Sequence, residues 1–357
     1  MKLLYITPSL IKCGPNVVLS GLVKGLNNSE NEIDVIFLDD KKQGIDFGCN
    51  PVKFKSSIFW QILTGKMVID YDVVHSHGLR ADFIALLLKL TMILKFKTKK
   101  PKFVTTIHNY VFQDLFFTKG ITKSIFFGLA WSVIWLFFDK CVVLSNHAKS
   151  YYWFIKRKTV VINNGVSVPA EITPINIKDK YSIPENSIVI GSCANITKIK
   201  GLDIIINALS NVDNVYFFLM GDGIEKRNLQ KTVRKLELTN KVIFLPSDNE
   251  PYSFMAGLDI FAVPSRSEGF GLTIIEAAML GTPVIVSNIP IFKELFSDIA
   301  GYIDLESSHQ DFVTLVKNIY HQKDEISRTS KIVAKRKFSS QLMAEKYFDM
   351  YCEITSL

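Results

Sequence analysis

The sequence predicts an α/β protein made of two doubly wound domains, each with a parallel sheet. Short apolar runs of strand length alternate with longer helical patterns through most of the chain. At 357 residues the chain is long for one compact core. Residues 167–187 interrupt the alternation with three prolines and little periodicity. We therefore expect two units, residues 1–167 and 168–339.

The first unit shows strand-like runs separated by helical patterns. Predicted strands occupy residues 2–6, 32–38, 72–76, 102–108, 140–144 and 159–162. Predicted helices occupy residues 16–26, a stretch from residue 81, residues 124–138 and a stretch capped by Ser145. The helix over 124–138 has fifteen residues without a charge. Because about 20 residues are needed to span a bilayer, we expect it to be buried or to lie at an interface.

The second unit repeats the alternation. Predicted strands occupy residues 187–193, 215–220, 242–245, 259–263, 284–286 and 301–303. One predicted helix begins at Lys200-Gly201, a second ends near residue 236, and a third covers residues 249–257. Another follows Gly271, and the pattern is helical from residue 310 to a last helix at 341–354. In two such units, a ligand is expected in a cleft at the C-terminal ends of the strands.

The net charge of +8 is unevenly divided along the chain. Residues 1–167 contain 22 Lys and Arg against 11 Asp and Glu, whereas residues 168–357 contain 20 against 23. Six lysines and no acid lie from Lys89 to Lys102, after an apolar run. This pattern favours peripheral contact with an anionic membrane surface, and a solvated helix end is the alternative. No nucleic-acid-binding motif accompanies the charge, so nucleic acid is not expected as a partner.

Cysteine use and the N-terminus bear on location. The five cysteines are scattered and have no metal-type spacing, which indicates free thiols in a reducing cytosol. The apolar run at the N-terminus is too short for a signal peptide. We expect a cytoplasmic protein, peripheral at the inner face of the cytoplasmic membrane.

The stretch Val263–Val286 carries the strongest functional signal. A strand, a glycine-containing loop, a helix and a strand follow one another, with Glu268 in the loop and Glu276 in the helix. A helix that begins after small residues offers free N–H groups and a positive dipole end, which suit a phosphate. The carboxylates would repel that phosphate, whereas sugar hydroxyls can donate to them. Phosphate plus sugar suggests a nucleotide sugar.

Weaker signals come from other strand ends. Lys200, beside Gly201 at a helix start, suits a diphosphate, although a solvated lysine is the alternative. His108 ends a predicted strand and should point at the cleft, and Gly14 lies in the first strand-to-helix loop. One of His75 and His77 is expected to be structural, and His147 to be solvated. The turn at Gly221-Asp222-Gly223 is expected to be structural first.

Several site classes lose support. Asp70-Tyr71-Asp72 has the spacing of metal-dependent sugar transferases, but it precedes its strand and therefore lies at the wrong edge of a parallel sheet. No Cys and His cluster suits zinc, so no metal site is expected. Dinucleotide-binding and P-loop glycine motifs are absent from the sequence.

These residues together resemble the glycosyltransferase family 4 group of retaining GT-B enzymes. The resemblance covers nearly the whole chain and is most specific in S-R-S-E-G-F-G-L-T-I-I-E, which is similar to the family's E-x7-E signature. N-I-T-K-I-K-G is similar to its diphosphate-binding segment, and D-V-V-H-S-H-G, T-I-H-N, I-N-N-G-V and G-D-G follow in family-like order. The resemblance implies a last helix, 340–357, that crosses back onto the first unit.

The resemblance also implies roles. Three catalytic residues are implied: Glu268 on the donor sugar, Lys200 on the departing diphosphate, and His108 reaching the sugar from the first unit. Glu276 would bind the ribose hydroxyls. The other donor-binding residues implied are Gly14, Asn195, Gly269, Phe270, Gly271, Leu272 and Thr273. The family often has Arg where this chain has Asn195, so Lys198 or the helix end would carry more of the leaving charge.

The expected activity is that of a retaining, metal-independent glycosyltransferase. It would move a sugar from a nucleotide diphosphate sugar, without a further cofactor, to a lipid-linked or oligosaccharide acceptor in bacterial surface polysaccharide synthesis. A GT-B-shaped epimerase or phosphorylase is the second hypothesis, and a non-catalytic sugar-nucleotide-binding protein is the third. The sequence leaves the base, the sugar, the acceptor and the linkage open.

Overall fold

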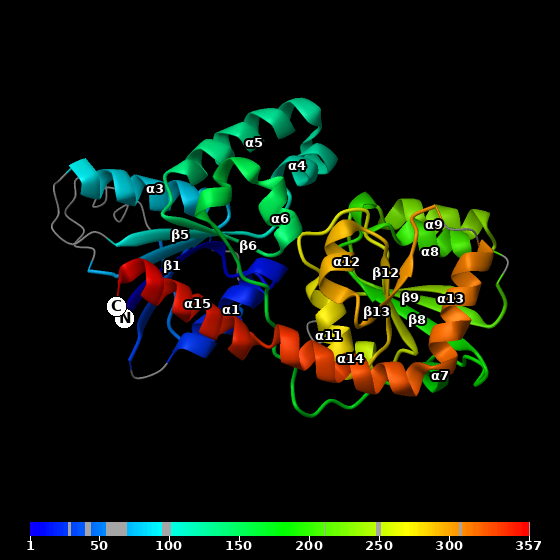
Figure 1. The fold of residues 1–357 in the computed structure, drawn as a ribbon. Helices are drawn as coiled ribbons and strands as arrows, with labels where there is room; N and C mark the ends of the chain where they lie inside the picture. The colour runs from blue at the N-terminus through cyan, green and yellow to red at the C-terminus, as the bar shows by residue number, and fades with distance from the viewer. Residues whose placement is uncertain are drawn as a thin grey trace. The chain divides into compact units, whose positions relative to one another are not determined.

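The chain forms two compact units. The computed structural model describes residues 1–27, 30–39, 44–54, 70–94, 101–210, 212–247, 251–306 and 309–356 (Figure 1). Unit 1 contains Met1–Val166 and Phe338–Leu357, and unit 2 contains Ser167–Lys337. The expected boundaries fell after residues 167 and 339.

Unit 1 is built on a parallel seven-stranded sheet. The strands lie in the order β3-β2-β1-β4-β5-β6-β7. Their bounds are β1 Lys2–Ser9, β2 Glu32–Asp39, β3 Val52–Lys53, β4 Val73–His77, β5 Lys102–Ile107, β6 Lys140–Val143 and β7 Thr159–Val161. The central strands β1, β4 and β5 are almost entirely buried, as expected for a sheet covered by helices on both faces.

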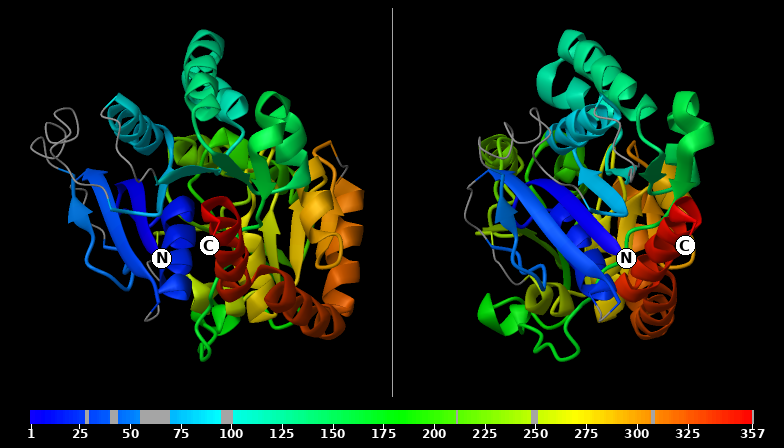
Figure 2. Two further views of the ribbon diagram at one scale, coloured as in Figure 1. Left: turned by 60° about the vertical axis from the view of Figure 1, so that its left-hand side comes forward. Right: turned by 90° about the vertical axis from the view of Figure 1, so that its left-hand side faces the viewer.

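Helices cover both faces of this sheet (Figures 1 and 2). One face holds α3 and α5, and the other holds α1 and α15, which lie side by side. The helices of unit 1 are α1 Gly14–Leu26, α3 Leu79–Leu94, α4 Val111–Lys119, α5 Ile121–Leu136, α6 Asn146–Tyr151 and α15 Ser340–Thr355, with a 3-10 helix at Trp153–Lys158.

Unit 2 has a parallel six-stranded sheet in the order β10-β9-β8-β11-β12-β13. Its strands are β8 Ile188–Cys193, β9 Val215–Met220, β10 Val242–Leu245, β11 Ile260–Val263, β12 Val284–Ser287 and β13 Ala300–Ile303. Its helices are α7 Ile177–Lys180, α8 Leu202–Ala208, α9 Lys226–Lys235, α10 Tyr252–Ala256, α11 Leu272–Leu280, α12 Pro290–Phe296, α13 His309–His321 and α14 Lys323–Phe338, with a 3-10 helix at Lys198–Lys200. Aliphatic side chains of β8, β9, α8 and α13 form its core.

Each sheet has one point where the strand order reverses. In unit 1 the chain leaves β1 for β2 on one side and later adds β4 on the other. In unit 2 the same reversal separates β8 from β11. Loops that leave two such neighbouring strands diverge to opposite faces of the sheet and leave a crevice at their C-terminal ends. The crevice positions are therefore the loops after β1 and β4, and the loops after β8 and β11.

Buried hydrogen bonds hold α15 onto the sheet of unit 1. The hydroxyls of Tyr351 and Tyr5 lie 3.1 Å apart, and the hydroxyls of Tyr347 and Thr106 lie 2.9 Å apart. Both tyrosines of α15 are fully buried. The start of the helix is fixed as well, because Ser340 N donates to the carbonyl of Val166 at 3.1 Å.

The structure differs from the sequence prediction in several local elements. The apolar helix expected at 124–138 is the second of a pair, since α4 precedes it and Gly120, with a φ of 81°, separates the two. Gly14 is the first residue of α1 and not a loop residue. A one-turn helix, α7, lies inside the expected linker. Among the described residues, no helix is both long and apolar enough to cross a membrane.

We predict that Gly165→Ala destabilises unit 1. A Cβ at Gly165 would lie 2.3 Å from the carbonyl oxygen of Ser339, where α15 begins, so backbone must move. We expect a loss of about 1–3 kcal/mol. Urea unfolding followed by tryptophan fluorescence measures it, because all four tryptophans lie within residues 1–166. Gly44→Ala is the control, since a Cβ there meets no atom of the described residues within 4 Å. Equal midpoints for both variants would contradict the prediction.

Candidate functional site

In unit 2 the two crevice loops meet through an ion pair. Lys200 Nζ lies 2.6 Å from Glu268 Oε2, and both side chains are largely buried. The hydroxyl of Ser265 donates to the same carboxylate oxygen at 3.2 Å. A lysine of the β8 loop and a glutamate of the β11 loop therefore face each other at the point where the strand order reverses.

Close backbone packing fixes the spacing of these loops. Gly201 has a φ of +63°, and a Cβ there would lie 2.0 Å from the carbonyl oxygen of Pro264. The backbone N–H of Arg266 donates to the carbonyl of Ile199 at 2.8 Å. Lys200 lies directly between these contacts, so its side chain starts from a fixed point.

Arg266 adds a second link between the loops. Its guanidinium donates to both carboxylate oxygens of Asp203, at 2.8 and 2.7 Å, and to the carbonyl of Lys198 at 2.9 Å. Burial alone would raise the pKa of the Asp203 carboxyl, but pairing with Arg266 outweighs it, and the pKa is lowered. A bidentate pair of this kind gives geometric precision as well as energy.

The loop after β11 leads into α11 through Gly271, whose φ of 100° lies in the left-handed region. The first N–H groups of α11, on Leu272 and Thr273, lack an intrahelical partner, as in any α-helix. Glu276 follows one turn later and is 9% exposed. The Tyr252 hydroxyl lies 3.4 Å from its Oε1, and burial together with the charge of Glu276 raises the pKa of Tyr252.

A neighbouring pocket of about 350 Å³ includes Asn195. Its lining residues are Cys193, Ala194, Asn195, Met220, Gly221, Asp222, Ser247 and Pro251. The turn at 221–223 packs tightly on this segment, because a Cβ at Gly221 would lie 2.0 Å from the carbonyl oxygen of Ala194. The backbone N–H of Ile196 donates to the carbonyl of Asp222 at 2.7 Å. The glycines of this turn have the structural role that the sequence predicted.

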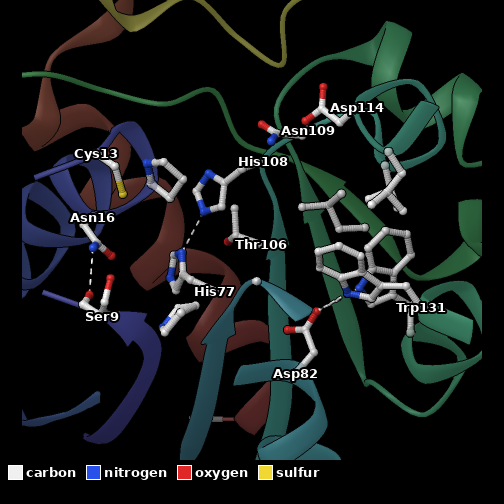
Figure 3. A pocket seen from close by; sticks show the side chains of 17 residues that line it. Ser9, Cys13, Asn16, His77, Asp82, Thr106, His108, Asn109, Asp114 and Trp131 are labelled. Atoms are coloured by element: carbon white, nitrogen blue, oxygen red, sulfur yellow. Dashed lines mark hydrogen bonds between the residues drawn. The ribbon is translucent and has the colours of Figure 1, made fainter. Parts of the chain in front are cut away.

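Unit 1 has its own pocket, of about 370 Å³, at the reversal between β1 and β4 (Figure 3). His108, directly after β5, lines it together with His77, the last residue of β4. Gly14 does not line it, although its neighbours Cys13 and Pro15 do. Opposite the histidines the wall is apolar and aromatic, with Trp131 and Trp135 from α5.

A histidine stack of three neighbouring imidazoles extends from this pocket into the sheet, with His77 and His108 stacked and His75 tilted against His77. The ring centroids of His75 and His77 are 4.5 Å apart, and those of His77 and His108 are 5.1 Å apart. Burial lowers the pKa of His75 to about 3 and that of His108 to about 4. Burial and the other two imidazoles lower the pKa of His77 well below its ordinary value. All three rings are therefore neutral at pH 7.

A buried carboxylate holds the aromatic wall in place. Asp82 of α3 accepts hydrogen bonds from Ser76 Oγ at 2.6 Å and Thr105 Oγ1 at 2.8 Å. It also accepts from the indole N–H groups of Trp131 at 2.7 Å and Trp135 at 3.1 Å (Figure 3). Burial raises its pKa, and these four donors oppose that shift. Asp82 thereby links α5 to the strands β4 and β5.

The sequence-predicted residues divide between the two units. Lys200 and Glu268 are in contact, and Gly269–Thr273 and Glu276 belong to the same loop and helix as Glu268. Asn195 lines the adjacent pocket. His108 and Gly14 belong to unit 1.

Sequence reasoning missed Arg266, Asp82 and the two tryptophans. The signal for Asp82 was a lone acid in an apolar helical pattern. His147 was expected to be solvated, but its Nδ1 lies 2.6 Å from the Tyr110 hydroxyl.

Asp70 and Asp72 lie at the opposite edge of the sheet from the pocket. The backbone N–H of Lys2 donates to the Asp72 carboxylate at 2.8 Å, and Lys2 Nζ lies 3.4 Å from Asp70. These acids therefore organise the entry to β1 and β4, as the sequence predicted. Within the described ranges, no group of three His, Cys, Asp or Glu side chains is arranged to hold a metal ion.

Comparison with known proteins identifies the family. Residues 14–168 match the sequence pattern described as Glycosyltransferase Family 4, and residues 175–336 match that described as Glycosyl transferases group 1. The O-antigen biosynthesis glycosyltransferase WclY of Escherichia coli is 41% identical over 358 residues, which cover 98% of each chain. The chain belongs to glycosyltransferase family 4.

Solved structures similar to this family 4 protein share its fold. Anabaena HepE, in complex with UDP and glucose, has a TM-score of 0.80 at 18% identity and full coverage of both chains. Sucrose-phosphate synthase from Thermosynechococcus elongatus has a TM-score of 0.78 at 14% identity, with 99% of each chain covered. The family 4 protein thus has the GT-B fold with two Rossmann-like units, and it is a glycosyltransferase.

We predict that the histidine stack makes the stability of unit 1 fall with acidification. A folded-state pKa below the unfolded value of about 6.5 means that the native state binds fewer protons. Stability is then fully present above pH 6.5 and is lost as the pH falls towards the folded pKa values, about 3 for His75 and about 4 for His108. Each histidine adds at most about 1.4 kcal/mol per pH unit.

The measurement is urea unfolding by tryptophan fluorescence between pH 6.5 and 5. His75→Gln should give a shallower dependence of the unfolding free energy on pH than the wild type, whatever its absolute stability. His321→Gln removes an exposed imidazole of α13 in unit 2 and is the control. Identical slopes for the wild type and His75→Gln would show that protonation of His75 does not contribute to the loss of stability at low pH.

Proposed function

We propose that this glycosyltransferase moves a sugar from a nucleotide diphosphate sugar to an acceptor hydroxyl, with retention at the anomeric carbon. The observation that carries the proposal is the Lys200–Glu268 pair at the loop that leads into α11 and Glu276. A cation and free helix N–H groups suit a diphosphate, and two carboxylates suit the hydroxyls of two sugars. WclY, whose name places it in O-antigen biosynthesis, supports a role in bacterial surface polysaccharide assembly.

Donor binding would divide the work among these groups. The diphosphate would take Lys200 as its counter-ion and the N–H groups of Leu272 and Thr273 as hydrogen-bond donors. Glu276, largely buried one turn into α11, would accept from the ribose hydroxyls. Glu268, released from Lys200, would accept from hydroxyls of the donor sugar.

Transfer would break the bond between the anomeric carbon and the diphosphate oxygen, with the electron pair leaving on the phosphate. The acceptor hydroxyl would attack the same face, and its proton would go to the departing phosphate oxygen. Lys200 and the α11 N-terminus would stabilise the negative charge that develops there, so the reaction is proposed to be metal-independent. Removing one comparable electrostatic contact in an active site costs roughly 10²–10³ in kcat.

We assign the acceptor to unit 1. Its 370 Å³ pocket combines Trp131, Asn109 and Asp114 with His108, the residue expected to reach the donor sugar. Aromatic faces and polar groups together suit a glycan. An oligosaccharide acceptor carried on a lipid accounts for both this pocket and the apolar surface beside it.

That apolar surface runs along α5. Its exposed side chains follow helical spacing: Ile121, Ile125, Phe126, Leu129, Val133 and Leu136. Phe126 is 69% exposed and Leu129 57%. Together with the excess of basic residues in 1–167, an exposed apolar helix face suits the headgroup boundary of an anionic bilayer. We propose peripheral binding at the inner face of the cytoplasmic membrane, where a lipid-linked acceptor lies.

The lysine cluster expected to contribute to this contact is only partly described. Lys95, Lys97, Lys99 and Lys100 lie outside the described residues. Lys89 pairs with Asp139 at 2.8 Å, and Lys102 is exposed. The apolar face of α5 is therefore the testable part of the surface.

We predict that Glu276→Gln weakens binding of the nucleotide sugar at least tenfold, because the amide replaces a charged acceptor of two ribose hydroxyls. Thermal shift with a panel of nucleotide sugars finds the donor, and titration then gives the affinity. Glu325→Gln, on the exposed face of α14, should bind like the wild type. Unchanged affinity in Glu276→Gln would remove the ribose role.

NMR of the product then decides the anomeric configuration, and inversion would exclude the proposed stereochemistry.

We predict that a double change of Phe126 and Leu129 to Glu abolishes recruitment to vesicles containing phosphatidylglycerol. Burying each side chain in the bilayer boundary contributes about 1.5–3 kcal/mol, so partitioning should fall at least about tenfold. Vesicle co-sedimentation measures it. Ile332→Glu alters an exposed apolar residue of α14, 66% exposed, and should leave recruitment unchanged. Equal recruitment of the double variant would show that α5 is not the membrane contact.

A further inference from the structure

His77 is a buried imidazole with one ring nitrogen bonded and one not. Its Nδ1 lies 2.8 Å from His108 Nε2. Its Nε2 is buried and has no hydrogen-bond partner among the described residues. The side chain is 2% exposed. Buried polar atoms without partners are uncommon, so this one constrains where the protons lie.

Neutral imidazoles allow the protons to be counted. Each neutral ring carries one N–H, and a contact between two ring nitrogens needs one donor and one acceptor. The pair therefore has two arrangements. Either His108 donates from Nε2 to His77, or His77 donates from Nδ1 to His108.

The buried Nε2 of His77 decides between them. If His108 were the donor, the proton of His77 would sit on Nε2 as a buried N–H without an acceptor. If His77 is the donor, that nitrogen carries only an unused lone pair. Orphaned buried N–H groups are rarer than under-satisfied acceptors, so the second arrangement is favoured. The proton of His108 then lies on Nδ1.

We propose that His77 is a positioning residue that holds His108 as its Nδ1–H tautomer, so that His108 offers a hydrogen-bond donor to a sugar hydroxyl bound in the pocket of unit 1. His108 lines the pocket of unit 1, and no contact within the described residues occupies its Nδ1. The hydroxyl oxygens of a sugar in this pocket can accept a hydrogen bond from it. The ligand named here rests on the proposed function, whereas the tautomer does not.

The sheet holds His77 in the required orientation. Its ring lies between those of His75, to which it is tilted, and His108, with which it is stacked. His75 is itself fixed from both sides, with Nδ1 2.6 Å from the Tyr351 hydroxyl and Nε2 2.8 Å from Thr106 Oγ1. The donor geometry of His108 thus depends on α15 through two further rings. A ring packed and bonded in this way cannot turn its other nitrogen towards His108 without breaking the stack.

The direct test is ¹⁵N NMR of histidine-labelled protein without ligand. The chain has six histidines, so the signals of His108 are assigned as those that are missing from the spectrum of His108→Asn. We expect the shifts of an imidazole protonated on Nδ1. Protonation on Nε2 overturns the proposal. This result does not depend on turnover, so it stands even if no nucleotide sugar proves to be a substrate.

The functional test compares two substitutions of equal size and opposite hydrogen-bond polarity. The amide of His77→Asn can donate to His108 Nε2, whereas the carboxylate of His77→Asp can only accept. We expect His77→Asn to keep the Nδ1–H tautomer and kcat within about threefold, and His77→Asp to move the proton to Nε2 and lower kcat at least tenfold. Both should bind the nucleoside diphosphate of the donor found by thermal shift like the wild type, because the residues proposed to bind it lie in unit 2.

A merely structural role predicts a different result. Both variants would then lose stability and activity together, with the tautomer of His108 unchanged. Equal kcat values for His77→Asn and His77→Asp, or an unchanged tautomer in His77→Asp, would refute the positioning role. Tryptophan fluorescence unfolding of each variant separates loss of fold from loss of donor geometry.

Discussion

A parallel sheet that reverses its strand order must leave a crevice, and both units of this glycosyltransferase depend on that constraint. Two neighbouring strands send their loops to opposite faces, which leaves room for side chains at their C-terminal ends. In unit 2 the gap is closed by Lys200 and Glu268, one from each loop. In unit 1 the pocket at the reversal is lined by the paired imidazoles of His77, the last residue of β4, and His108, directly after β5. The residues with chemistry are those that fill a topological gap.

The charged and polar groups in these crevices follow the cost of burial. Asp82 is buried with four donors, and its role is to hold a wall. Glu268 has a cation and a hydroxyl, both of which a ligand can displace. A carboxylate that is satisfied by several fixed donors is therefore structural here. Glu268, which is satisfied by a lysine and one hydroxyl, is the carboxylate that we propose for exchange with substrate groups.

Much of this architecture was predictable from the sequence, since strand and helix periods alternate almost without interruption. The residues proposed for donor binding could be chosen from the sequence because they lie in two short contiguous segments, around Lys200 and from Glu268 to Glu276. The hydrogen bonds that hold these segments in place were not predictable. Arg266 and Asp203 are 63 positions apart, and Trp131 and Asp82 are 49 apart, so only the folded chain reveals them. The aromatic wall looked like core because both tryptophans occur in an apolar run.

The return of α15 to the first sheet has a consequence for the order in which the nascent chain can be completed. The hydroxyls of Tyr347 and Tyr351 satisfy Thr106 and His75, yet they are synthesised after all of unit 2. Until α15 is made, His75 Nδ1 lacks the Tyr351 hydroxyl and Thr106 Oγ1 lacks the Tyr347 hydroxyl, although His75 Nε2 and Thr106 Oγ1 can still pair. Unit 2 is by then already contiguous and free to fold. The unit that is synthesised first is therefore completed last, because its sheet lacks α15 until the final helix emerges.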